Sequence, residues 1–465
     1  MRVLQVSMRP GIGGVGIYVD NLTVELARRG VEVGWFYPGE YDCRLLPHVK
    51  QYVRENGVRI FAFRNSPNVH AAYGYVHPSL EVNHPVIERH FRKALKTFQP
   101  DLVHFHDFGG LCSSLISIAS DLSLITVNSL HSYWFICPKN DLIFTRTGQI
   151  CPGPEAGNNC SLCITPSTRR VAMARIQATI WQTAKAVVPH KLLSLLQPPI
   201  VRLYHRWWTP GQQRRVSVAV LQNQELISAY GERERNNLRL LCDRVTMNIA
   251  VSTFVKQRFV EWGVPPERLI VQHIGTRAAE FLKPVAREIK MPVTFGYIGP
   301  LTYHKGAHTL VDAFNLLDSN LETRLIVYGD NGSQYAEGLK QRVRNGAVQF
   351  RPRYRHEDLQ EILKEIDVVV VPPIWYDNAP QVVFESLSAG VPVIGARIGG
   401  IPDFVRDGEN GILYEAGNAE DLAKKMTMVA RDPSLILRMR TRIRTMKTMI
   451  EHVEELLSLY ESLIQ

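Results

Sequence analysis

The chain has 465 residues, which is too long for one hydrophobic core and fits two domains with room for an insertion. Hydrophobic residues make up 45% and charged residues 21%, both ordinary values for a soluble globular protein. No apolar run of about 18 residues occurs, so no membrane-spanning helix is expected. The opening MRVLQVS is too short before its first glycines to be a signal peptide, so we expect a cytoplasmic protein.

The N-terminal part predicts a parallel α/β sheet. A strand at 2–7 leads into a glycine loop at 11–16, a helix at 18–29 that Gly30 closes, and a strand at 31–37. Further strands are expected at 58–63, 101–105 and 124–128. This βαβ opening is typical of a doubly wound domain.

The glycine loop also matches the dinucleotide-binding fingerprint. Gly11, Gly13 and Gly16 have the required spacing, and Glu40 lies where a ribose-binding acid would follow the next strand. A single match of this kind is weak evidence. A nicotinamide-dependent enzyme therefore stays an alternative.

Four of the seven cysteines are clustered in a loop rich in glycine and proline. In a cytosolic chain such a cluster favours a metal site over disulfides, and four thiolates suit a structural zinc. Free reduced thiols are the alternative. The cluster comprises Cys137, Cys151, Cys160 and Cys163.

The net charge of +10 is concentrated in one segment. Residues 156–224 contain no Asp or Glu, and their cations are mixed with apolar and aromatic side chains that include Trp181, Trp207 and Trp208. Such a composition predicts a surface that lies in the interface of an anionic membrane. A helix pair that packs on the core with a solvated basic face is the alternative, and nucleic-acid binding is disfavoured because no such motif accompanies the charge. The cations are Arg169, Arg170, Arg175, Lys185, Lys191, Arg202, Arg206, Arg214 and Arg215.

A second βα series begins near Met291. Two such series, joined around 276–290, predict two Rossmann-like domains that face a cleft. The expected strands are 294–299, 324–329, 348–350 and 367–372, and the expected helices are 306–317, 335–344 and 357–365.

Residues 375–413 carry the strongest functional signal. Asp377 precedes Glu385 by eight positions, and Pro380 suits the first turn of a helix that ends near Gly390. Free amides at a helix N-terminus bind anions, and carboxylates beside them can hold hydroxyls. This combination suits a nucleotide sugar, although an amphipathic helix with a solvated Glu385 is the alternative.

The same segment resembles the donor-binding stretch of family 4 retaining glycosyltransferases, which have the GT-B fold. The family pattern is Glu-x7-Glu, then Ala-Gly-x-Pro-Val-Ile, Gly-Gly-x-Pro-Glu and Asn-Gly. Asp377 and Asp403 stand where the family has Glu, and Gly399-Gly400 and Asn410-Gly411 match. The resemblance implies a retaining sugar transfer from a nucleotide-activated donor, without a catalytic metal.

The resemblance also implies roles for individual residues. Lys305 would contact the diphosphate, but Pro300 replaces the Arg that usually accompanies it, and Arg351, Arg353 or Arg355 could substitute. His131, at a strand end, would contribute to the sugar pocket. Asp377 would hold sugar hydroxyls and Glu385 the ribose. The other expected donor-binding residues are Gly13, Gly14, Gly299, Asn378, Ala379, Pro380, Gln381 and Val382.

These features predict an α/β protein with two Rossmann-like domains and a basic helical insertion in the first. We expect an N-terminal domain at 1–275 with the insertion at about 137–224, a donor domain at 290–445, and a C-terminal helix at 446–465 that crosses back. The acceptor is expected to be a glycan or lipid-linked molecule at the cytoplasmic membrane face. The alternatives are a phosphorylase or sucrose-type synthase on the same fold, and a catalytically impaired homologue that serves as an assembly subunit.

Overall fold

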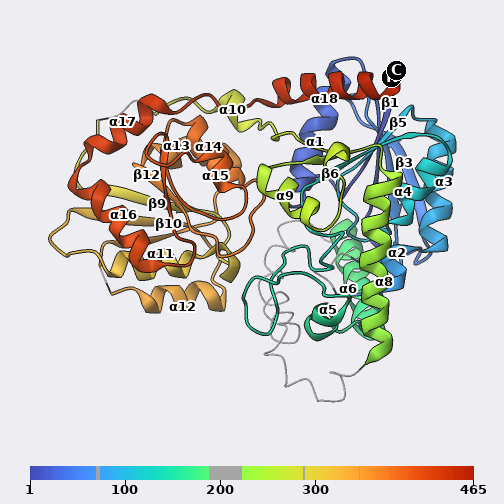
Figure 1. The fold of residues 1–465 in the computed structure, drawn as a ribbon, viewed down its shortest axis with the longest axis horizontal. Coiled ribbons are helices and arrows are strands. Elements are labelled where there is room, and N and C mark those ends of the chain that lie inside the picture. Colours follow the sequence, from blue (N-terminus) through green and yellow to red (C-terminus); the bar gives the residue numbers. More distant parts are fainter. Residues whose placement is uncertain (70–73, 188–222, 286–287, 345) are drawn as a thin grey trace. The chain divides into compact units, whose positions relative to one another are not determined.

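The computed structural model describes residues 1–69, 74–187, 223–285, 288–344 and 346–465, and divides into two compact units (Figure 1). The first unit comprises Met1–Ile249, Val260–Ile270 and Leu459–Gln465. The second comprises Ala250–Phe259 and Val271–Ser458. Each unit is built around its own sheet.

The first unit contains an eight-stranded sheet with the order β3-β4-β2-β1-β5-β6-β7-β8. β1 pairs in parallel with β2 and β5. Among the recorded pairings of this sheet, that of β3 with β4 is the antiparallel one, and the sequence analysis did not predict β3. Strand order therefore reverses direction between β1 and β5, which makes this the switch point of the sheet. The strands are β1 (Arg2–Val6), β2 (Glu32–Pro38), β3 (His48–Val53), β4 (Arg59–Arg64), β5 (Leu102–Phe105), β6 (Ile125–Leu130), β7 (Met247–Ala250) and β8 (Leu269–Val271).

The helices that follow these strands bury one apolar face. In α3, residues Ile87, Phe91, Leu95 and Phe98 recur at helical spacing and are all buried. Phe91 lies edge-on to Phe36 of β2, with 5.3 Å between ring centres, so α3 is held on the sheet by aromatic packing. The helices before β7 are α1 (Gly13–Arg28), α2 (Pro78–Val82), α3 (Pro85–Phe98), α4 (Ser114–Asp121), α5 (Asn158–Cys163), α6 (Thr168–Val187) and α8 (Gln224–Arg239). After β7 comes α9 (Thr253–Glu261), which belongs to the second unit up to Phe259.

The second unit contains a six-stranded sheet with the order β11-β10-β9-β12-β13-β14. All its recorded pairings are parallel, so the second predicted βα series is confirmed. The switch point lies between β9 and β12. The strands are β9 (Val293–Ile298), β10 (Thr323–Asp330), β11 (Val348–Pro352), β12 (Val368–Val371), β13 (Val393–Ala396) and β14 (Gly411–Tyr414).

The core of this unit joins strand residues such as Phe295 and Val370 to Leu310 and Phe314 of α11 and Met426 of α16. The helices are α10 (Ala278–Phe281), α11 (Ala307–Asn315), α12 (Gln334–Arg342), α13 (Leu359–Lys364), α14 (Gln381–Ser388), α15 (Ile401–Phe404), α16 (Ala419–Arg431) and α17 (Ser434–Arg442). The chain continues into α18 (Met449–Ile464), whose end belongs to the first unit from Leu459 onward.

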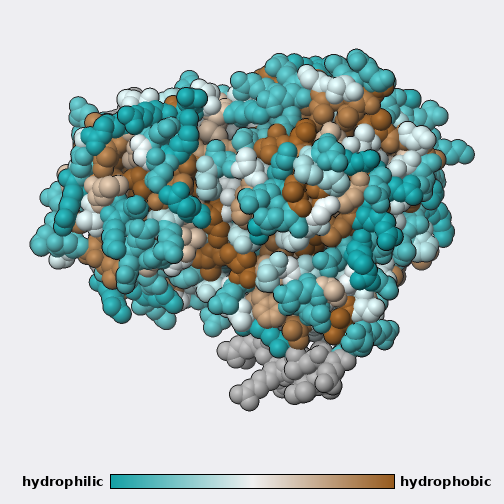
Figure 2. Space-filling model, viewed as in Figure 1, coloured by the Kyte–Doolittle hydropathy of each residue, from teal (hydrophilic) through white to brown (hydrophobic). Residues whose placement is uncertain are grey.

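Hydrophilic side chains cover most of the face in view, with hydrophobic ones gathered in patches between them (Figure 2). Within the described residues, no helix has the length and apolar character needed to cross a membrane.

Candidate functional site

The switch point of the second sheet brings together two residues that the sequence analysis singled out. Lys305 lies in the loop after β9, and Asp377 lies in the loop after β12. Lys305 Nζ is 2.6 Å from Asp377 Oδ2 and 5.1 Å from the ring centre of Trp375. The Asp377 side chain is 11% exposed and that of Lys305 27%, so water screens this pair only in part. A fixed ammonium group at the carboxyl edge of a parallel sheet can neutralise a phosphate.

Glycines allow the surrounding loops to approach one another. Gly306 has a φ of +71°, and a Cβ there would lie 1.7 Å from Pro372 O. A Cβ on Gly400 would lie 1.9 Å from Asn378 O, and Gly400 N donates a hydrogen bond to Asp377 O at 2.8 Å. The Gly-Gly turn therefore supports the loop that carries Asp377, because only a residue without a side chain fits against that backbone.

The loop after β12 continues into α14, whose N-terminus receives no side-chain cap. Asn378 and Ala379 precede the N-cap residue Pro380, while Gln381 and Val382 form the first turn. Pro380 was expected inside the first turn and instead precedes it. Val383 N donates to Pro380 O at 3.0 Å, while the first amides of a helix, here those of Gln381 and Val382, have no acceptor within the helix.

Glu385 is buried in the second turn of α14. Burial raises the pKa of its carboxyl to about 7. His356 Nδ1 lies 3.7 Å from Glu385 Oε1, and burial lowers the pKa of that histidine. A carboxyl group with a raised pKa in a site of this kind is a candidate for a functional role.

A carboxylate network behind the Gly-Gly turn was missed by the sequence analysis. Asp403 accepts hydrogen bonds from the backbone N of Thr253 at 2.6 Å, from the Thr253 hydroxyl, and from His273 Nε2 at 3.0 Å. Burial raises the pKa of Asp403, but His273 and Thr253 outweigh this effect and hold it below its usual value. The network anchors the turn, and no local pattern pointed to His273 or Thr253 because they lie far from Asp403 along the chain.

His131 follows β6 in the first unit and contacts two aromatic side chains. Its Nε2 lies 3.1 Å from His106 Nδ1, and its ring centre is 4.8 Å from that of Tyr18. Burial lowers the pKa of His131 to about 3, so its ring is neutral at physiological pH. His104 and His106, on or next to β5, join the same network.

The glycine loop after β1 lies at the switch point of the first sheet. Gly13 has a φ of +61° and begins α1, while a Cβ on Gly14 would meet no atom within 4 Å. Packing within the chain therefore does not explain Gly14, in contrast to Gly16, where a Cβ would lie 2.5 Å from Arg9 O. Glu40, the candidate ribose ligand of the dehydrogenase alternative, pairs with Arg9 at 2.6 Å.

The predicted zinc site is not found in the described part of the chain. No group of three or more His, Cys, Asp or Glu residues in the described part of the chain is placed to hold a metal, and all four clustered cysteines are described. The Cys151 thiol donates to Gly153 O at 3.3 Å, and Cys163 contacts the Thr145 hydroxyl at 2.8 Å. Burial raises the pKa of Cys137 to about 12 and also raises that of Cys160, which keeps both as neutral thiols.

The basic segment is described only in part. Arg169, Arg170 and Arg175 belong to α6, but a helical insertion is not shown beyond Val187. Residues 188–222 lie outside the described residues, and they include Lys191, Arg202, Arg206, Arg214, Arg215, Trp207 and Trp208.

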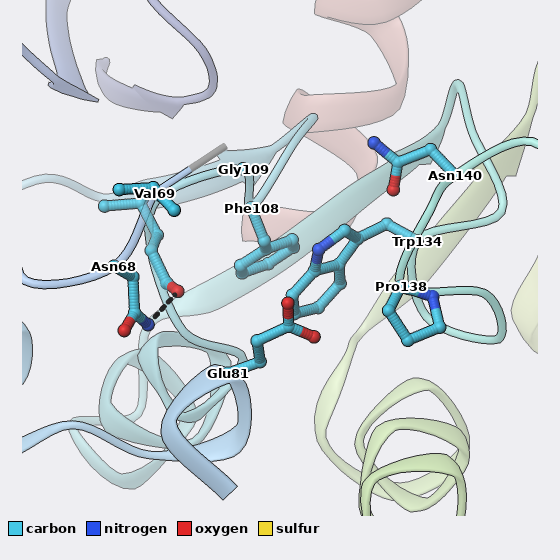
Figure 3. Close-up of a pocket in the computed structure, with 10 residues that line it drawn as sticks. Asn68, Val69, Glu81, Phe108, Gly109, Trp134, Pro138 and Asn140 are labelled. Carbon is cyan, nitrogen blue, oxygen red and sulfur yellow. Dashed lines mark hydrogen bonds between the residues drawn. The ribbon is translucent and has the colours of Figure 1, made fainter. Parts of the chain in front are cut away.

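A small pocket in the first unit contains none of the predicted site residues (Figure 3). Phe108 and Trp134 stack there with 5.1 Å between ring centres, and the Glu81 carboxylate lies beside them. Glu81 Oε2 accepts a hydrogen bond from Arg233 Nε at 2.5 Å, and the Arg233 guanidinium lies 4.6 Å from the Trp134 ring centre. The carboxylate of Glu81 and the guanidinium of Arg233 therefore pair with each other at this pocket.

Two family models match the chain. Residues 279–446 match Glycosyl transferases group 1, and residues 12–169 match Glycosyltransferase Family 4. A D-inositol 3-phosphate glycosyltransferase of Streptomyces bingchenggensis is 30% identical over 203 residues, which cover 38% of this chain and 43% of the relative. A glycogen synthase of Mycobacterium tuberculosis is 25% identical over 255 residues, which cover 53% of this chain and 59% of the relative. The chain spans about half the length of the curated relatives it matches.

Solved structures resemble the whole fold at low sequence identity. A sucrose-phosphate synthase from Thermosynechococcus elongatus has a TM-score of 0.63 and 17% identity, over 100% of this chain and 99% of that one. The Anabaena protein HepE in complex with UDP and glucose has a TM-score of 0.57 and 14% identity, over 99% and 100%. At these identities the likeness establishes the fold, which is α/β with two parallel-sheet, Rossmann-like domains of the GT-B kind.

Proposed function

Because the chain belongs to the group 1 and family 4 glycosyltransferases, we propose that it transfers a sugar, with retention, from a nucleotide-activated donor to a glycan or lipid-linked acceptor. One observation carries the proposal. Lys305 and Asp377 meet at the switch point of the second sheet, beside the uncapped N-terminus of α14. A cation, free amides and a carboxylate in one place match the phosphates and hydroxyls of a nucleotide sugar.

The proposed roles divide the donor among these groups. Lys305 and the backbone N–H groups of Ala379, Gln381 and Val382 bind the diphosphate and stabilise the negative charge that develops as it leaves. Asp377 holds a hydroxyl of the donor sugar and keeps the ammonium of Lys305 directed at the switch point. The ionised carboxylate of Glu385 accepts hydrogen bonds from the ribose hydroxyls. These hydroxyls take the place of the water molecules that burial keeps away from the carboxylate. Asn378, Pro380 and Gln381 shape the same loop.

Glycine residues would let the donor approach the backbone. Gly14 is proposed to be such a residue. A Cβ there would meet no atom of the chain, so packing within the chain does not explain why this residue is a glycine. Gly13 and Gly299 have positive φ values and shape the loops after β1 and β9. His131, in the first unit, is proposed to contact the sugar.

The acceptor is proposed to be reached at the cytoplasmic face of a membrane. The basis is the acid-free segment 156–224, whose described helix α6 exposes Met173, Ile176 and Ile180 on one face. Exposed apolar groups among cations suit a membrane interface.

A catalytically impaired homologue is the second candidate. Pro300 removes one of the cations expected at the diphosphate, and Lys305 is already paired with Asp377. A protein of this kind would bind a nucleotide sugar without cleaving it.

The test combines binding with turnover. The purified protein is screened by thermal shift against a panel of nucleotide sugars, and release of nucleoside diphosphate from each stabilising donor is then measured. Stabilisation by one donor with slow release of its diphosphate supports the transferase, because water can take the place of a missing acceptor. Stabilisation without any release supports the impaired homologue, and no stabilisation by any donor overturns the proposal.

A further inference from the structure

His356 lies at the same edge of the second sheet as Lys305 and Asp377. β11 runs parallel to β10, β10 to β9, and β12 to β9, so the loops that follow these strands leave the sheet at one edge. Lys305 follows β9, Asp377 follows β12, and His356 follows β11. His356 has no role in the proposed function. Its place in the fold makes it a candidate for contact with the same donor.

A short turn fixes the backbone at His356. Residues His356–Asp358 form a 3₁₀ turn that leads directly into α13. Arg355 N donates a hydrogen bond to Asp358 Oδ2 at 3.2 Å, and Asp358 N donates to Arg355 O at 2.9 Å. Reciprocal hydrogen bonds of this kind satisfy the free amides at the start of a helix and define how the chain enters it. The imidazole of His356 is therefore carried by a defined backbone.

The imidazole ring is oriented by packing but stays accessible. Phe281 of α10 lies perpendicular to it, with 5.4 Å between ring centres, and edge-to-face packing favours one ring orientation. The segment after α10 is held in place, because Lys283 N donates to Gln360 Oε1 at 2.8 Å and Lys283 O accepts from Gln360 Nε2 at 3.2 Å. The His356 side chain is nevertheless 57% exposed, so a ligand can reach it.

The spacing of His356 and Glu385 suits two groups that bind a third one between them. His356 Nδ1 lies 3.7 Å from Glu385 Oε1, which is too far for a direct hydrogen bond. An oxygen atom about 2.8 Å from each of these two atoms would form a hydrogen bond with both. A hydroxyl group meets this requirement, because its hydrogen is donated to the carboxylate while its oxygen accepts from the imidazole N–H. A proton on Nδ1 is favoured, since this nitrogen faces the carboxylate.

The Glu385 carboxylate has acceptor sites left for such a hydroxyl. Burial raises its pKa with no hydrogen bond to oppose the effect, so no donor among the described residues occupies this carboxylate. A buried polar group without a partner gains more from a ligand hydrogen bond than an exposed one does. The hydroxyl between the two side chains therefore comes from the ligand.

We propose that His356 is a specificity-determining residue of the donor site, which shares one ribose hydroxyl of the nucleotide with Glu385. The inference rests on the proposed function, in which Glu385 binds the ribose. It adds that one hydroxyl, at C2′ or C3′, is held by a carboxylate that accepts and an imidazole that donates. The site thereby selects a ribonucleotide over the deoxynucleotide that lacks this hydroxyl.

The test measures nucleotide binding and does not depend on transfer. UDP, ADP and GDP are titrated into the full-length protein by calorimetry, and the one that binds most tightly is compared with its 2′-deoxy and 3′-deoxy forms. His356→Phe keeps an aromatic ring against Phe281 but removes both nitrogens, while His356→Asn keeps an N–H donor near the position of Nδ1. Glu357→Gln is the matched control, because it changes the next residue of the same turn, whose side chain is 78% exposed and pairs with Arg355 at 3.6 Å.

Wild type, His356→Asn and Glu357→Gln are expected to bind one of the two deoxy forms about tenfold to a hundredfold more weakly than the ribonucleotide, because a hydrogen bond to a charged group is lost. In His356→Phe the affinity for the ribonucleotide should fall about threefold to tenfold, while the affinity for that deoxy form stays at the wild-type value. Discrimination against the other deoxy form should not change. Glu385→Gln should reduce discrimination against the same hydroxyl as His356→Phe does.

A His356→Phe variant that weakens the ribonucleotide and both deoxy forms by one common factor overturns the inference, since a merely structural role gives this result. Sensitivity of His356→Phe and Glu385→Gln to different hydroxyls also overturns it. Thermal unfolding shows whether each variant is folded, and His356→Leu replaces His356→Phe if the latter is not. Wild type that binds none of the three diphosphates overturns the proposed function and this inference together, whereas binding without the expected discrimination overturns the inference alone.

Discussion

The ammonium group of Lys305 has two possible partners, the Asp377 carboxylate and an incoming diphosphate. An ion pair at 2.6 Å between partly buried groups is stronger than an exposed one, but it still exchanges when a more highly charged anion arrives. A diphosphate carries more negative charge than one carboxylate. Binding of the donor should therefore draw Lys305 to the phosphates and leave Asp377 to accept from a sugar hydroxyl.

Replacing Lys305 by Met should leave the fold intact and reduce transfer about a hundredfold or more, because a preorganised group that stabilises the departing charge is lost. The measurement is kcat and KM for the best donor, together with the affinity for the nucleoside and for its diphosphate. Affinity for the diphosphate should fall while that for the nucleoside stays. Lys364→Met is the control, since Lys364 is a surface cation paired with Glu361 on α13. Equal losses for nucleoside and diphosphate would contradict a phosphate contact.

Glu385 makes the stability of the protein depend on pH. Below its ordinary pKa of 4.5 the carboxyl is protonated in the folded and unfolded chain alike, so it has no net effect. As pH rises toward about 7, the unfolded chain releases the proton and the folded chain retains it, so the free energy of unfolding falls. The shift from 4.5 to about 7 corresponds to about 3 kcal/mol, lost in full above pH 7.

Glu385→Gln should therefore raise the free energy of unfolding by up to about 3 kcal/mol at pH 8 and leave it unchanged at pH 4. Denaturant unfolding at the two pH values measures this difference. The same variant should lose donor affinity at pH 8, because an amide is a weaker acceptor for the ribose hydroxyls than a carboxylate. A variant that is no more stable at pH 8 than wild type would show that the carboxyl is already solvated or paired.

At the scale of elements, the loops after β9 and β12 owe their shape to glycines that touch other backbone. Gly400 has an ordinary backbone conformation, so the need for glycine there comes from the 1.9 Å approach to Asn378 O and not from φ. A side chain at 400 would displace the loop that carries Asp377. The effect would reach the site without changing any functional group.

Gly400→Ala is expected to lower stability by about 1–3 kcal/mol and to weaken donor binding, because the loop must move to accept the new methyl group. Gly338→Ala is the matched control. Gly338 lies in α12 with no atom within 4 Å of an added Cβ, so alanine should raise stability there by about 0.5–1 kcal/mol. Thermal unfolding and donor titration of both variants measure the contrast. Unchanged donor affinity in Gly400→Ala would show that the turn does not support Asp377.

Most of the strands could be predicted because their signals are local. Alternating apolar runs and closing glycines located both sheets, and α18 was expected within 446–465, where it is found at Met449–Ile464. Strand β3 was missed because its burial pattern is that of an exposed edge, with no apolar alternation to detect. The short strands β7, β8 and β14 were not predicted either. Lys305, Asp377 and Glu385 were found through motif spacing. The partners of Asp403 and the contact between His106 and His131 were not found, because they join residues that only the fold brings together.

At the scale of the whole molecule, the sequence shows directly where the positive charge is concentrated. The cysteine spacing, in contrast, predicted a zinc site that the described residues do not show. The spacing of four cysteines suggested zinc, but two of the thiols are buried and the others have hydrogen-bond partners. Spacing along a loop does not determine where side chains point. The uneven distribution of charge along the chain is a different kind of signal from the cysteine spacing, because it does not depend on conformation and its electrostatic attraction acts over a distance.

The acid-free segment should bind anionic bilayers reversibly. Each cation near such a surface contributes about 1 kcal/mol, and the attraction acts over about 8 Å at physiological salt, so binding should weaken as salt rises.

Replacing Arg202, Arg206, Arg214 and Arg215 by Gln should greatly reduce sedimentation with anionic vesicles. The control replaces Lys424, Lys425, Arg442 and Arg444, which lowers the net charge equally outside the segment. The double variant Ile176→Ser with Ile180→Ser should lose the part of the vesicle binding that persists at high salt. These exposed side chains of α6 supply the apolar contact with the bilayer. Equal pelleting of the segment variant and the control would mean that net charge alone attracts the protein and that the segment has no membrane role.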